Sequence, residues 1–172
     1  MIEIKQPLKK ELMAGIEWHG DQAGRLVSEN RNIRIGVAVS RFNDEVTSRL
    51  LQGAKQVFET SGSDHDVFWV PGAFELSTMA GVLVQRDYDA VLCLGAVIRG
   101  ETLHFDYIAH AVARSLADLG IQHGKPVLFG VLTTDTVEQA MERSGGGQGN
   151  RGADAASGAL EMVNLLRQPK ND

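Results

Sequence analysis

Four short apolar runs, each followed by a segment with helical spacing, constrain the fold of this chain more than any other feature. The runs lie at residues 33–39, 66–70, 90–98 and 127–132, and their length and β-branched content are typical of strands. Strands that alternate strictly with helices are parallel and joined by right-handed crossovers. The pattern therefore predicts an α/β fold, a three-layer α/β/α sandwich with a four-stranded parallel sheet.

The ends of the helices are predicted from capping residues. Asn43 is placed to cap the helix after the first strand, and Gly120 is expected to close the long helix after the third. Asp135 and Glu138 have the spacing of a capping box in front of a short helix that ends near Arg143.

The chain is long enough for one domain with its own core. Its 172 residues are divided into an α/β domain over residues 31–168 and an amino-terminal arm over residues 1–30, where Pro7 and several glycines interrupt any period. The only cysteine, Cys93, lies in the third apolar run and is interpreted as buried filler, with a nucleophile as the less favoured alternative.

Charge and hydropathy exclude several classes of partner. The net charge of −5 includes no basic stripe, which argues against nucleic acid. No apolar run approaches the roughly 20 residues that span a bilayer, and the amino end resembles neither a signal nor a transit peptide. We expect a soluble, cytoplasmic protein that does not bind a membrane.

The segment from Gly95 to Ile108 is the strongest indication of a functional site. An apolar run ends abruptly there at charged and hydroxyl residues, and after Thr102 the spacing becomes helical, so that His104 lies at a strand-to-helix crossover. Ligands of open α/β sheets bind at the carboxyl ends of strands, near free N–H groups of helices. We expect a site there.

Four loops follow the predicted strands at their carboxyl ends and are expected to converge on one rim. They cover residues 40–43, 71–75, 99–104 and 133–135. Their convergence is the argument for a site, because each loop alone carries little information.

Four side chains are candidates for a functional role, three of them in the rim loops and Arg143 at the end of the short helix that follows, and each has a structural alternative. Phe42 could stack on a planar heterocycle or pack, and Glu75 could bind a polyhydroxylated ligand or simply favour a helix dipole. His104 suits proton transfer, with capping or packing as the alternative. Arg143 could grip phosphate or interact with the carboxyl end of its own helix.

Two other motifs carry no chemistry in this interpretation. Residues 147–152 formally match G-x-G-x-x-G, but they follow a helix near the carboxyl end, whereas a dinucleotide fingerprint occupies the first strand-to-helix turn. Of His104, Asp106 and His110, only the last two share a helical face, so we predict no metal site.

Six ordered motifs of the chain resemble the 6,7-dimethyl-8-ribityllumazine synthase family, also described as the riboflavin synthase beta-chain family. The resemblance covers about residues 33–166, and its motifs are VSRFN (39–43), PGAFE (71–75), GAVIRGET followed by HFDY (95–107), FGVLTT (129–134), EQAMER (138–143) and GNRG (149–152). The resemblance implies a flavodoxin-like sheet and the condensation of 5-amino-6-(D-ribitylamino)uracil with 3,4-dihydroxy-2-butanone 4-phosphate, releasing phosphate and water, in riboflavin biosynthesis. It implies a transferase without cofactor or metal.

The resemblance also assigns roles to individual residues. It implies that His104 is the proton shuttle and that Phe42 stacks on the pyrimidine. It also implies that Phe129 reaches the site from a neighbouring subunit. The remaining residues that it implies for substrate binding are Ala73, Phe74 and Glu75 for the ribityl chain, the backbone of Ala96, Val97 and Ile98 for the pyrimidine edge, and Glu101, Thr102 and Arg143 for the phosphate.

Two residues depart from the family pattern. Arg151 replaces a usual lysine, which keeps the charge but changes its geometry, so its contribution to binding stays open. Glu101 brings a negative charge near the proposed phosphate site, and its side chain is expected to point to solvent.

The resemblance further implies a homopentamer, in some members a shell of sixty subunits, with riboflavin synthase as a candidate partner. The short segment from Ser144 to Gly149 modestly favours a shell. The alternatives are a noncatalytic lumazine- or flavin-binding receptor or storage protein, against which His104 and Arg143 both argue, and a general flavodoxin-like module, which would need a hydroxyl-rich phosphate loop after the first strand.

Overall fold

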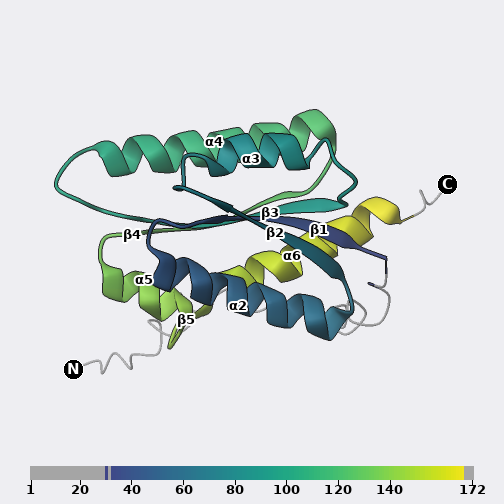
Figure 1. Ribbon diagram of the computed structural model, residues 1–172, viewed down its shortest axis with the longest axis horizontal. Helices are drawn as coiled ribbons and strands as arrows, with labels where there is room; N and C mark the ends of the chain where they lie inside the picture. The colour runs from purple at the N-terminus through teal and green to yellow at the C-terminus, as the bar shows by residue number, and fades with distance from the viewer. Residues whose placement is uncertain (1–29, 31, 169–172) are drawn as a thin grey trace, which may run out of the picture.

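The computed structural model of the protein describes residue 30 and residues 32–168. Within this part of the chain, strands and helices alternate (Figure 1). The elements are β1 (Arg34–Ser40), α2 (Asp44–Ser61), β2 (Asp64–Val70), α3 (Leu76–Leu83), β3 (Ala90–Ile98), α4 (His104–His123), β4 (Val127–Thr134), α5 (Val137–Arg143), β5 (Ser144–Gly146), β6 (Gly149–Asn150) and α6 (Arg151–Arg167).

The main sheet has four parallel strands in the order β2-β1-β3-β4. Helices α3 and α4 cover one face, and α2, α5 and α6 lie on the other (Figure 1). The predicted α/β/α sandwich with a flavodoxin-like parallel sheet is confirmed. The short antiparallel pair β5 and β6 forms a separate hairpin between α5 and α6.

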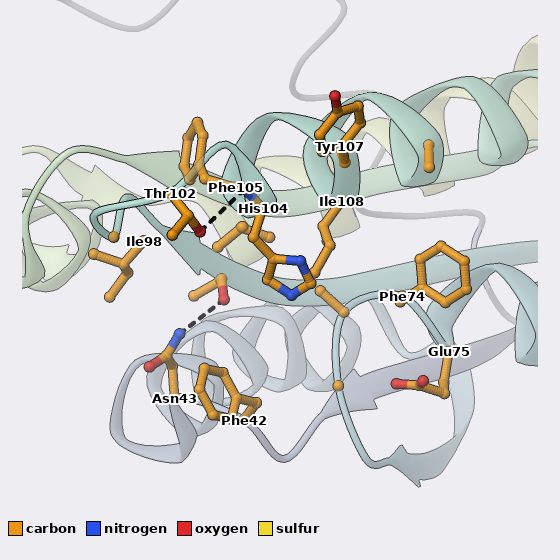
Figure 2. A pocket seen from close by; sticks show the side chains of 16 residues that line it. Phe42, Asn43, Phe74, Glu75, Ile98, Thr102, His104, Phe105, Tyr107 and Ile108 are labelled. Atoms are coloured by element: carbon orange, nitrogen blue, oxygen red, sulfur yellow. Dashed lines mark hydrogen bonds between the residues drawn. The ribbon is translucent and has the colours of Figure 1, made fainter.

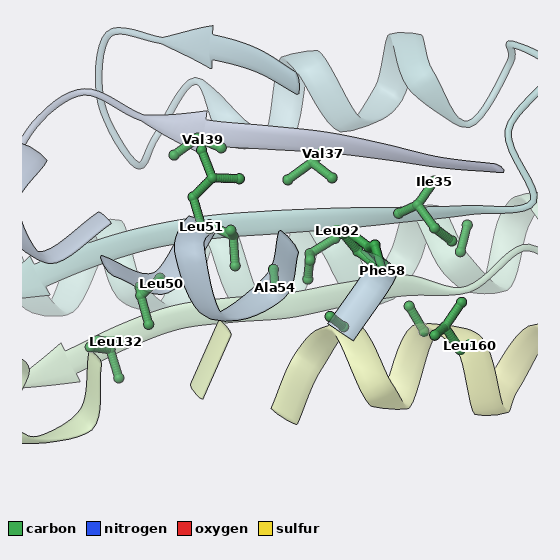
Figure 3. Packing of buried hydrophobic residues seen from close by; sticks show 14 of the residues in the cluster. Ile35, Val37, Val39, Leu50, Leu51, Ala54, Phe58, Leu92, Leu132 and Leu160 are labelled. Carbon is green, nitrogen blue, oxygen red and sulfur yellow. The ribbon is translucent and has the colours of Figure 1, made fainter. Parts of the chain in front are cut away.

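An apolar core lies on each face of the sheet, between the strands and the helices that cover that face. Strand β3 contributes to both cores and is therefore buried along almost its whole length. Leu92 and Leu94 face a core with Phe58 of α2 and Leu160 of α6, where Figure 3 shows the packed side chains. The alternate residues of β3, including Cys93, face the core beneath α3 and α4. A continuous apolar run is therefore required in this strand, since each of its faces meets a helical layer.

Helix α4 ends later than predicted. Gly120 lies inside the helix, and the chain leaves it at Gly124, whose φ of 59° is left-handed and whose N–H donates to the carbonyl of Gly120. Both glycines satisfy a sequence rule for helix ends, but only Gly124 adopts the conformation that glycine accommodates without strain.

The two predicted caps also differ in detail. Asn43 occupies the position before α2, but its side chain makes no capping hydrogen bond. Thr136, one residue after the predicted Asp135, caps α5 by accepting a hydrogen bond from the backbone of Gln139. The end of α5 at Arg143 is as predicted.

The predicted arm over residues 1–30 lies outside the described residues except for Asn30. That residue is buried, and its Oδ1 accepts a hydrogen bond of 2.8 Å from Nδ2 of Asn164 in α6.

Candidate functional site

A pocket of about 820 Å³ opens at the carboxyl ends of β1, β2 and β3 (Figure 2). The direction of winding reverses between β1 and β3, which is where open α/β sheets form a crevice. The lining residues come from three loops and from the first turns of α4. They are Phe42, Asn43, Gly72, Ala73, Phe74, Glu75, Ala96, Val97, Ile98, Gly100, Thr102, His104, Phe105, Tyr107, Ile108 and Ala111.

Three of the four predicted loops line the pocket, and the fourth does not. The loop after β4 instead contacts the loop after β3, because Nε of Arg99 donates to Asp135 at 2.7 Å and its backbone N–H donates to Thr134. Since β4 is at the edge of the sheet, its carboxyl end lies one strand farther from the crevice.

His104 is the first residue of α4 and is exposed to solvent. Its ring projects from the helix towards the loops that carry Phe42 and Phe74 (Figure 2). Its backbone N–H lies 3.4 Å from Oγ1 of Thr102, which lines the same pocket. The imidazole can therefore exchange protons both with a bound molecule and with water.

Phe42 presents an aromatic ring at the pocket rim. Its side chain is 70% exposed, although its backbone is fixed by a hydrogen bond of 3.1 Å to the carbonyl of Pro71. The preceding Arg41 is held in the same way by Val70. A ring on such a supported loop can stack on a planar heterocycle with little loss of conformational freedom.

The loop after β2 brings a buried residue and two exposed ones to the pocket. Ala73 is buried, whereas the Phe74 ring is 58% exposed. Glu75 stands at the start of α3 without making a capping hydrogen bond, so its carboxylate has acceptor capacity for a ligand.

The end of β3 contributes backbone to the pocket. Ala96 and Val97 are buried, and Ile98 is half-buried. Main-chain groups at a strand end can bind the edge of a heterocycle, because each peptide unit offers one donor and one acceptor.

Four residues implied by the family resemblance lie outside the lining of this pocket. Glu101 is exposed between two lining residues, Gly100 and Thr102. The other three are Phe129, Arg143 and Arg151.

These three side chains lie on other parts of the surface. Phe129 lies in the edge strand β4 and is 40% exposed. The guanidinium of Arg143 donates to the carbonyl of Gln139 in its own helix, and that of Arg151 pairs with Asp154 at 2.8 Å. The structure thus brings His104 together with the residues proposed for the pyrimidine and ribityl groups, but not with these two arginines.

Helix α4 supplies pocket residues beyond His104. Tyr107, Ile108 and Ala111 lie three, four and seven positions after it, the spacing of one helical face, and all line the pocket. This spacing is visible in the sequence, but spacing alone does not distinguish a helical face that lines a pocket from one that packs in the core.

Two ionisable groups in β3 and in the loop after it have raised pKa values. Hydrogen bonding to Asp135 raises the pKa of Arg99, which also contacts Asp106 at 3.3 Å. Burial raises the pKa of the Cys93 thiol to about 12, so this cysteine is not a nucleophile at neutral pH. Residues 30 and 32–168 contain no cluster of metal-ligating side chains and no helix able to span a membrane.

A known protein family matches most of the chain. The chain matches the family described as 6,7-dimethyl-8-ribityllumazine synthase over residues 32–167. The matched region includes every element of the sheet and the whole pocket.

Proposed function

The chain belongs to the 6,7-dimethyl-8-ribityllumazine synthase family, which implies a transferase of riboflavin biosynthesis, and from this premise we propose the reaction and the roles of its residues. The protein condenses 5-amino-6-(D-ribitylamino)uracil with 3,4-dihydroxy-2-butanone 4-phosphate, releasing phosphate and water. One observation carries the proposal: an exposed aromatic ring, a strand-end backbone and a histidine surround a single pocket of about 820 Å³.

The pyrimidine is bound between Phe42 and the end of β3. The exposed ring of Phe42 stacks on the planar heterocycle, and the backbone of residues 96–98 hydrogen-bonds to its edge. This assignment is supported by the position of both groups on the same pocket. Stacking supplies affinity, whereas the backbone donors and acceptors distinguish the pyrimidine from other flat molecules.

The polar parts of the two substrates occupy opposite ends of the pocket. Residues 73–75 hold the ribityl chain, where the Glu75 carboxylate accepts hydrogen bonds from hydroxyl groups. The loop that carries Thr102 receives the phosphate near the start of α4, where free N–H groups and the helix dipole favour an anion. The Glu101 side chain is directed to solvent and leaves only its backbone to this site.

His104 moves the protons of the reaction. Imine formation removes protons from the attacking amine and adds one to the departing hydroxyl, phosphate elimination removes a proton from carbon, and ring closure again transfers protons. None of these steps needs a strong nucleophile, so one general acid–base group and good orientation suffice.

A second copy of the chain completes the site. Phe129 and Arg143 lie outside the pocket of their own chain, and their proposed roles therefore require a neighbour. A homopentamer, alone or within a shell of sixty subunits, satisfies this requirement. In this proposal the enzyme is cytoplasmic, acts without a metal or organic cofactor, and hands its product to riboflavin synthase.

The test is to mix the purified protein with both substrates and follow lumazine absorbance together with phosphate release. We expect acceleration of both, and His104→Ala to slow turnover by about 10²- to 10⁴-fold. His110→Ala is the matched control, because this exposed histidine lies on the same helix but does not line the pocket. Tight flavin binding without acceleration would support the noncatalytic receptor instead.

A further inference from the structure

Asn43 stands directly before α2, but its side chain bonds to β3 and does not cap this helix. Its backbone is left-handed, with φ 60° and ψ 47°, and its carbonyl accepts the first helical hydrogen bonds, from Val46 and Thr47. The side chain leaves the helix uncapped. Instead, Nδ2 donates a hydrogen bond of 2.9 Å to the carbonyl of Ala96 at the end of β3 (Figure 2).

This hydrogen bond crosses the crevice of the sheet. It joins the loop after β1 to the end of β3, two segments 53 residues apart in the chain, and both of its residues line the pocket. Ala96 is only 2% exposed, so the bond satisfies a carbonyl that has little access to water. Phe42, the neighbour of Asn43 in the loop, has an exposed ring, and its backbone N–H donates to the carbonyl of Pro71 after β2. The Asn43 amide adds the contact that connects this loop to β3.

Two separate requirements meet at this position. A left-handed backbone is accessible to glycine and, among other residues, mainly to asparagine and aspartate. The contact with a carbonyl requires a donor, which glycine and an ionised aspartate lack. Asparagine satisfies both requirements.

We infer that Asn43 is a positioning residue for the pyrimidine half of the pocket. Its amide fixes the distance between the loop that carries Phe42 and the backbone of residues 96–98. The two surfaces are therefore held at a fixed separation before a planar ring binds between them. This inference rests on the proposed function for its substrate, whereas the restraint on the loop does not.

Two substitutions separate the amide from the backbone requirement. Asn43→Gly keeps the left-handed conformation and removes the side chain, and Asn43→Asp keeps the size but replaces the donor with an acceptor. We expect both to raise the KM for the pyrimidine substrate about three- to tenfold, the range that one net hydrogen bond gives. The KM for the phosphorylated substrate and kcat should stay within about twofold.

Glu45→Gln is the matched control. Glu45 is an exposed residue of the first turn of α2 that does not line the pocket, and its substitution should leave both KM values unchanged. Phe42→Ala provides a double-mutant cycle: if Asn43 acts through Phe42, Asn43→Gly should add little to the KM of the Phe42→Ala variant. Additive effects would overturn the inference, as would an unchanged pyrimidine KM in Asn43→Gly.

Hydrogen exchange without substrate tests the restraint directly. The backbone amides of Arg41 and Phe42 donate to Val70 and Pro71, and their exchange should accelerate in both variants but not in Glu45→Gln. Unchanged exchange, or equal acceleration throughout the domain, would overturn the inference. If the wild-type protein neither binds the pyrimidine nor forms lumazine, the proposed function fails, and the exchange result still decides whether Asn43 holds the loop.

Discussion

Replacing Asn150 with alanine is expected to remove the hydrogen bonds that cap α6 and connect it to α2 and β5. Its Oδ1 accepts hydrogen bonds from the backbone of Gly152 and Ala153 at 2.9 and 3.1 Å, and so caps α6. Its Nδ2 donates to the carbonyls of Arg49 in α2 and Ser144 in β5 at 2.8 and 3.1 Å. One amide therefore connects three elements.

The expected cost follows from these contacts. Losing an asparagine cap costs about 1–2 kcal/mol, and losing the two bonds to backbone carbonyls adds about 1 kcal/mol, because at least the Arg49 carbonyl lies inside a helix. We expect a total of about 2–3 kcal/mol, which corresponds to about 4–12 °C in Tm for a chain of this length. The Asn150 amide fills the space that Gly53 leaves by having no side chain, so Asn150→Ala would also create a void there.

Urea unfolding followed by circular dichroism, at one protein concentration, measures this loss as a shift of the midpoint. Thr136→Ala is the matched control, since that side chain caps α5 with a single hydrogen bond and should cost about 1 kcal/mol. Asn150→Asp keeps the cap acceptor and loses the donor, so its midpoint should lie between those of wild type and Asn150→Ala. The reasoning is refuted if Asn150→Ala unfolds at the same urea concentration as Thr136→Ala.

Three further outcomes are expected. Gly152→Ala should destabilise strongly or prevent folding, because a Cβ there would overlap the carbonyl of Leu50; a midpoint near that of wild type in urea would contradict this packing. Cys93 should resist a thiol reagent at pH 8 in the folded protein and react after denaturation, and rapid labelling of the folded chain would contradict its burial. A hydrogen bond from Tyr88 and a neighbouring guanidinium lower the pKa of Asp66 from its ordinary value of 3.8. The ionised Asp66 carboxylate therefore stabilises the fold above pH 3.8, and this stability is lost as pH falls through the lower pKa of the folded state. In Asp66→Asn, urea midpoints measured between pH 5 and 2 should lack this acid-dependent loss.

The strands were the most predictable part of the fold. The bounds of β3, Ala90–Ile98, are those of the apolar run itself, because a strand buried on both faces has no polar position inside it. The helix ends were less predictable. Gly120 and Gly124 both fit a rule for the end of α4, and only the backbone distinguishes them.

The candidate site was predictable as a set of loops but not in its membership. His104 and the loops after β1, β2 and β3 do meet at one pocket. The loop after β4 was expected at the same rim, and it does contact the loop after β3, but it does not line the pocket. Asn43 was expected to cap α2, which its side chain does not do. Parallel topology brings strand ends to one edge without deciding which of them share a pocket, and the role of Asn43 was assigned from its place along the chain alone.

The sequence by itself determined the alternation of strands and helices, the parallel sheet and the motifs of the family, because each of these is recorded in local spacing and residue type. Only the tertiary structure decided which loops share the pocket and which side chains stand apart from it. The strand order β2-β1-β3-β4 opens the crevice between β1 and β3 and leaves β4 at the edge. Strand order is set by how whole helical layers pack on the sheet, and no single segment of the chain encodes it.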